Sequence, residues 1–166
     1  LKSPINLKTL KNKIDLIFFE NSEIKTLVSP SQNTLEAKGT YSFDNSSFHK
    51  FGIVSKKDGK LFNIDLNFSF KNFLKIDLIN YIKDEKKISD IKLNFEIKKD
   101  FLHIKNFLYK EDKNIIALDN LKIIKSNITD LNNIEVKTYS GNNLKNDFKL
   151  FFGKQIKILG KKYDAK

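Results

Sequence analysis

The chain has 166 residues, of which 40% are hydrophobic, and its 31 basic and 20 acidic residues give a formal net charge of +11. This length suits one domain and is enough to bury about 70% of the surface that the unfolded chain exposes. The chain contains no cysteine, which excludes disulfide frameworks, thiolate metal sites and cysteine nucleophiles, and it has no apolar run long enough to cross a bilayer as a helix.

A short helix near the start of the chain is the first element that we expect. Ser3 and Pro4 are typical of an N-cap followed by a first-turn proline, and Leu7, Leu10 and Ile14 follow at helical spacing. A second short helix is expected in the turn that begins at Asp77, a residue type that caps helices well.

Alternation of apolar and polar residues dominates the rest of the chain. Residues 61–70 show it most clearly, since every even position is apolar and the odd positions between them are polar. This pattern predicts a half-buried strand with one solvated face, about 30 Å long. Residues 91–98 alternate in the same way, Lys99-Asp100 is suited to a turn, and Leu102 and Ile104 resume the alternation. The stretch 91–105 therefore predicts a hairpin.

Similar strands are expected elsewhere along the chain, at 35–43, 48–55, 114–118, 121–126, 134–139, 145–152 and 155–160. About ten strands at this spacing predict an antiparallel meander. We therefore expect a mainly β fold, a twisted and curled antiparallel meander that forms an open β-groove, or taco-like sheet, with one or two short helices.

We interpret the chain, 1–166, as a single β-rich segment of a longer polypeptide. Lys-Ile-Asp-Leu-Ile occurs at 13–17 and again at 75–79, which favours two repeats of about 60 residues, at about 1–70 and 71–166. The edge strands of such a segment need partners, so we expect adjoining β segments of the same parent protein to pair with both ends.

No group of residues has the pattern of a catalytic site. The two histidines, His49 and His103, lie on the polar faces of different expected strands, which makes a poor metal site. The adjacent acids Asp84-Glu85 and Glu111-Asp112 lie in lysine-rich turns and are interpreted as solvated. No phosphate-binding glycine loop, nucleophile elbow or zinc-binding helix motif is present. We predict no enzyme activity, no metal and no cofactor.

The basic residues are all lysine, with no arginine. Because arginine reads guanine bidentately, specific nucleic-acid recognition is not expected. A non-specific polyanion binder would gather its lysines on one face, whereas here they alternate with acids along the strands, so this reading ranks last. The lysine clusters are instead expected on a solvated surface, or at strand ends in contact with phosphate headgroups.

The apolar faces of the strands leave two functions open. In the first, a closed β-sandwich buries them and acts as a structural or interaction module without a ligand. In the second, the sheet stays open and its apolar face receives phospholipid acyl chains, each buried CH₂ contributing about 0.8 kcal/mol. The candidate lipid-facing residues are Ile64, Leu66, Phe68, Phe70, Leu93, Phe95, Ile97, Leu102 and Ile104.

The stretch 96–124 resembles a unit of the AsmA-like proteins, the group that includes the TamB and YhdP types of Gram-negative envelopes. Its strand, two-residue turn, strand, Phe107 and polar gap before the next strand carry the likeness, with Asp100 where glycine is usual. The ending at 157–165 is similar to an I-x-G-x-x-x-D-A element of the YhdP-like branch, and 35–41 is similar to its G-x-Y strand starts.

The resemblance implies a periplasmic β-groove segment of a protein that is anchored to the inner membrane. Such a segment shields or conducts phospholipid between the inner and outer membranes. It carries no catalytic residues, so the resemblance assigns none here.

Overall fold

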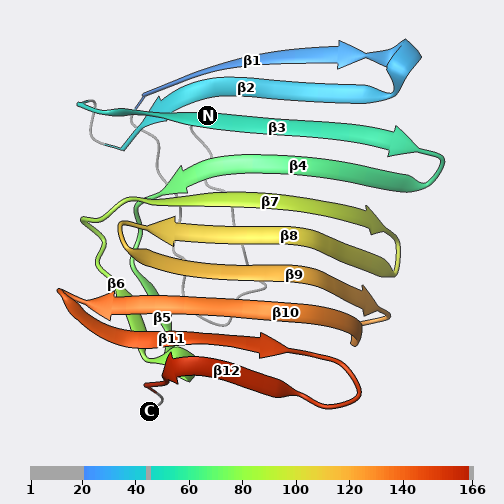
Figure 1. Ribbon diagram of the computed structural model, residues 1–166. Coiled ribbons are helices and arrows are strands. Elements are labelled where there is room, and N and C mark those ends of the chain that lie inside the picture. The colour runs from blue at the N-terminus through green and yellow to red at the C-terminus, as the bar shows by residue number, and fades with distance from the viewer. Residues whose placement is uncertain (1–20, 44–45, 165–166) are drawn as a thin grey trace.

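The computed structural model describes residues 21–43 and 46–164, which form a mainly β fold (Figure 1). Ten strands make one antiparallel sheet in the order β1-β2-β3-β4-β7-β8-β9-β10-β11-β12. The predicted fold class, a mainly β antiparallel meander, is therefore confirmed, because the ten strands form a sheet that does not close on itself. One continuous sheet runs through both of the expected repeats.

The sheet strands are β1 (Asn21–Ser29), β2 (Thr34–Ser42), β3 (Phe48–Asp58), β4 (Leu61–Phe70), β7 (Ser89–Lys98), β8 (Phe101–Glu111), β9 (Asn114–Ile124), β10 (Asn127–Ser140), β11 (Asn143–Phe151) and β12 (Lys157–Lys162). A 3-10 turn, η1 (Pro30–Gln32), links the first two. The expected helix near Ser3 lies outside the described residues.

Several tight turns between the strands contain residues with a left-handed backbone. Gly59, between β3 and β4, has a φ of 57°, and Gly141, between β10 and β11, has a φ of 59°. Between β9 and β10 both turn residues, Lys125 and Ser126, have positive φ, the combination found in type I′ hairpins. The predicted turn Lys99-Asp100 is also present, between β7 and β8.

Two details of the predicted strands were wrong. The strands expected at 114–118 and 121–126 are one strand, β9, because Asn120 takes a φ of 54° within it and the pairing with β8 continues on both sides. Strand β1 was not expected, since its sequence alternates only weakly, yet it pairs with β2 along its whole length.

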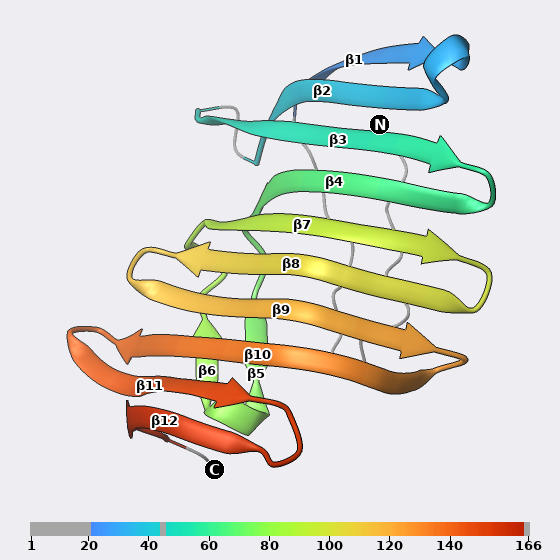
Figure 2. The same ribbon diagram turned by 45° about the vertical axis from the view of Figure 1, so that its right-hand side comes forward.

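An insertion between β4 and β7 crosses one face of the sheet (Figure 2). It consists of β5 (Leu74–Ile76), the 3-10 turn η2 (Asp77–Ile79) and β6 (Tyr81–Lys83). The helix expected at Asp77 is this single 3-10 turn, whose N-cap is Ile76 and has no side-chain hydrogen bond. Ile79 and Tyr81 of the insertion pack with Tyr109, Val136 and Phe148 of the sheet, and these five residues form the hydrophobic core.

Lys83, at the end of β6, is fully buried and fixes the insertion to the end of β4. Its Nζ donates hydrogen bonds to the carbonyl oxygens of Lys71 and Asn72, both at 2.9 Å, and of Asp84 at 3.1 Å. It also lies 5.0 Å from the centroid of the Phe70 ring. Burial lowers the pKa of Lys83 to about 8.

Stability is expected to rise between about pH 8 and pH 10.5 more steeply in the wild type than in Lys83→Met. In this window the folded protein has released the Lys83 proton while the unfolded chain still holds it, so rising pH favours the folded state by at most about 1.4 kcal/mol per pH unit. Urea denaturation of both proteins across this range measures the difference. Parallel pH profiles would show that Lys83 keeps its ordinary pKa.

Candidate functional site

All nine predicted lipid-facing residues lie on one face of the adjacent strands β4, β7 and β8. Ile64 pairs with Phe95, which pairs in turn with Ile104. Directly opposed residues in an antiparallel sheet project from the same face, as do alternate residues of one strand. The apolar positions predicted from the alternation within each strand therefore lie side by side across the three strands.

The same face is mainly apolar across the whole sheet, and we call it the apolar face. Its apolar residues, placed by the strand register, are Ile24, Val28, Leu35, Ala37, Tyr41, Phe51, Ile53, Phe62, Ile64, Leu66, Phe68, Phe70, Ile91, Leu93, Phe95, Ile97, Leu102, Ile104, Phe107, Tyr109, Ile116, Leu118, Leu121, Ile123, Ile128, Leu131, Ile134, Val136, Phe148, Leu150 and Ile158.

The opposite face is polar and is bound together by cross-strand contacts. Lys105 forms an ion pair with Glu96 at 2.7 Å, and the pKa of Glu96 is lowered mainly by this contact. Asn94 donates a hydrogen bond to Asp65, and Lys122 pairs with Asp130 at 3.1 Å. The sheet is thus amphipathic, with a wet face on one side and an apolar face on the other.

The insertion covers only one end of the apolar face. Side chains that pack around its core include Ile91, Phe107 and Ile134, which lie toward that end of their strands. Apolar side chains at the other end remain exposed, with relative exposures of 59% for Val28 and 66% for Ile128. The part of the apolar face that the insertion does not cover is our candidate functional site.

A buried polar network holds the insertion at the covered end. The Tyr81 hydroxyl lies 2.7 Å from that of Tyr109 and donates to Glu111 Oε2 at 2.9 Å, while Lys87 Nζ lies 2.9 Å from Glu111 Oε1. Asn114 donates to the same carboxylate. Burial would raise the pKa of Glu111, but the hydrogen bonds from Lys87, Asn114 and Tyr81 outweigh it and lower the pKa.

The interpretation of Glu111 as a solvated turn residue was wrong, because it is only 2% exposed. It continues the apolar-face alternation of Phe107 and Tyr109 on β8. The spacing of two residues from Phe107 to Tyr109 to Glu111 indicates that Glu111 lies on the apolar face. The neighbouring lysines made it look like a solvated turn residue instead. Its neighbour Asp112 is exposed in the turn, as expected.

The two histidines lie in different surroundings. His103 is on the polar face as predicted, opposite Glu96, with Nε2 2.8 Å from Asn120 Oδ1. His49 is not on the polar face, because it pairs with Tyr41 and its ring contacts those of Tyr41 and Phe43. Among residues 21–43 and 46–164, no three potential metal ligands gather at one place.

Comparisons with known proteins leave the family open, since no family model, curated protein or solved structure matches the chain. Within the described part of the chain, no helix is both long enough and apolar enough to cross a membrane.

Proposed function

We propose that the apolar face binds the acyl chains of phospholipids. In this proposal the chain is a periplasmic segment of an AsmA-like protein, anchored to the inner membrane of a Gram-negative bacterium, that shields or conducts phospholipid between the two membranes. The observation that supports it is the continuous apolar face of an unclosed sheet, covered by the insertion at one end only.

The dimensions of the sheet suit such a ligand. Ten strands at about 4.8 Å spacing are about 45 Å across, and most of the strands, with 9 to 11 residues, are about 30–36 Å long. Apolar patches on ordinary monomers rarely exceed about 600 Å². A long acyl chain moved from water onto this face gains on the order of 10 kcal/mol.

The alternative of a closed sandwich requires a second sheet over the apolar face. The described residues place only the two-stranded β5-β6 hairpin there, and its core contacts lie on β8, β10 and β11. The open arrangement therefore favours binding of a ligand on the rest of the apolar face over the function of a structural module without a ligand.

The outer edges of β1 and β12 have no neighbouring strand among the described residues. All six residues of β12 are exposed, as are most of those of β1. We propose that adjoining β segments of the same parent protein pair with these edges, which would extend the apolar face in both directions.

Photo-crosslinking tests the proposed function. A photoreactive amino acid is placed at Phe95 on the apolar face or at Asn94 on the polar face, and the full chain is irradiated with phospholipid vesicles. Because neighbouring residues of a strand project from opposite faces, Asn94 is the matched control. We expect lipid adducts, detected by mass spectrometry, at Phe95 and none at Asn94. Crosslinks at Phe95 only to the protein itself would overturn the proposal.

A further inference from the structure

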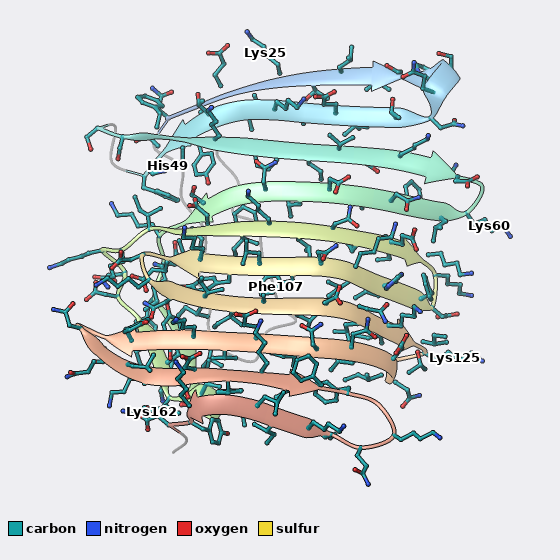
Figure 3. All side chains as sticks on the ribbon, in the orientation of Figure 1. Lys25, His49, Lys60, Phe107, Lys125 and Lys162 are labelled. Carbon is teal, nitrogen blue, oxygen red and sulfur yellow. The ribbon has the colours of Figure 1, made fainter. Side chains whose placement is uncertain are left out.

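Lysines gather in the turns at one end of the sheet. The β3–β4, β7–β8, β9–β10 and β11–β12 turns all lie at this end, on the right in Figure 1, whereas the insertion covers the apolar face toward the other. Figure 3 shows Lys60 and Lys125 at this end and Lys162 at the opposite one. We call it the lysine end; its lysines are Lys56, Lys57, Lys60, Lys98, Lys99, Lys125, Lys154 and Lys157.

The charges at the lysine end are not neutralised by the described residues. These turns carry only two acids, Asp58 and Asp100, against the eight lysines. All eight lysines are exposed, and none forms an ion pair with an acid in the described part of the chain.

The opposite end differs, because several of its lysines have partners and acids are more numerous among them. Lys83 is held by backbone carbonyls, Lys87 by Glu111, and Lys145 by Asp164 at 3.1 Å. The turns at that end carry Asp84, Glu85, Glu111 and Asp112 among their lysines, so the excess of positive charge is greater at the lysine end.

The exposed part of the apolar face reaches this same end. Phe62 and Ile97 are 40% and 39% exposed and lie next to the β3–β4 and β7–β8 turns. Lys57 Nζ lies 5.9 Å from the centroid of the Phe62 ring. Cationic groups thus border apolar surface, which is the arrangement that a lipid with an anionic headgroup requires.

We infer that the lysine end binds the headgroups of anionic phospholipids whose acyl chains lie along the strands toward the insertion. This inference rests on the proposed function and adds a headgroup preference and an orientation to it. The insertion stops the chains at one end and the lysines hold the phosphates at the other. Salt is expected to weaken the preference, since exposed charges are screened.

Charge reversal of three turn lysines tests the inference in the full chain. The test variant is Lys60→Glu, Lys99→Glu and Lys154→Glu, one from each of three turns at the lysine end. The matched control is Lys86→Glu, Lys110→Glu and Lys113→Glu, exposed lysines at the opposite end. Both variants change the net charge equally. Binding is measured by sedimentation with vesicles of phosphatidylglycerol or of phosphatidylcholine.

We expect the lysine-end variant to bind phosphatidylglycerol vesicles about 100-fold more weakly than the wild type, because each lysine near an anionic surface contributes about 1 kcal/mol. The control variant should lose at most about tenfold. Equal losses in the two variants, or equal wild-type binding to both lipids, would overturn the inference.

Crosslinking at Phe95 separates the two proposals. Adducts that form equally with both lipids, and that the lysine-end variant leaves unchanged, would overturn the headgroup inference while supporting acyl-chain binding. If neither lipid gives adducts at Phe95, the proposed function fails. Any vesicle binding that persists is then electrostatic adsorption of the protein to the vesicle surface.

Discussion

Replacing Phe148 by alanine is expected to lower the free energy of unfolding by about 3–5 kcal/mol. Phe148 is 5% exposed and packs in the core with Ile79 and Tyr81 of the insertion. Its ring also meets that of Tyr163 edge-on, with centroids 5.1 Å apart. The truncation removes buried apolar surface and leaves a cavity where the insertion contacts β11, so both terms act against the folded state.

Phe151→Ala is the matched control, because it lies on the same strand but on the other face. Phe151 is 38% exposed, and its truncation is expected to cost less than about 1 kcal/mol. Urea denaturation of both variants measures the difference. Equal losses would show that the insertion does not bury Phe148 in solution.

Removing the carboxylate of Glu111 is the second substitution with a large expected effect. Glu111→Ala should cost about 2–5 kcal/mol, since it leaves the buried side chains of Tyr81 and Asn114 without this acceptor and removes the ion pair with Lys87. Lys87, Tyr81 and Asn114 all contact it. Asp112→Asn is the control, because it removes an adjacent but exposed charge and asparagine tolerates the positive φ of that turn position.

The pH dependence gives this prediction a second measurement. Because hydrogen bonds hold the pKa of Glu111 below its ordinary value of 4.5 in the folded protein, the ionised carboxylate stabilises the fold above about pH 4.5. That contribution is lost as pH falls through the lower folded-state pKa. The stability difference between the wild type and Glu111→Gln should therefore shrink on acidification. A difference that stays constant down to about pH 3 would mean that the network does not lower the pKa of Glu111.

Most of the sheet could be predicted because its strands alternate strictly. Strand β4 begins and ends at the predicted residues, and the nine apolar positions share one face as their spacing indicates. The insertion was not predictable in the same way, since β5 and β6 have three residues each and such short strands carry too little alternation to detect.

The position of the insertion over the apolar face depends on contacts between residues that are far apart in the sequence. Ile79 lies in a 3-10 turn, yet its carbonyl accepts a hydrogen bond from Asn146 Nδ2 at 2.8 Å, 67 residues away. Nothing local to either residue indicates this pairing. The orientation of the insertion is set by tertiary packing, which is why the sequence showed the apolar face but not which end of it is covered.

The pairing of each sheet strand with its neighbours along the chain, interrupted only by the insertion, makes the architecture modular. Stability in such an array is close to a sum of nearest-neighbour terms, as it is in repeat proteins. A hairpin added or lost at either edge would therefore change the width of the sheet by two strand spacings without repacking the others. If the sheet binds lipid as proposed, duplication of hairpins would lengthen the path of the lipid across the strands. The lysine-bearing turns and the β5–β6 hairpin would keep their positions.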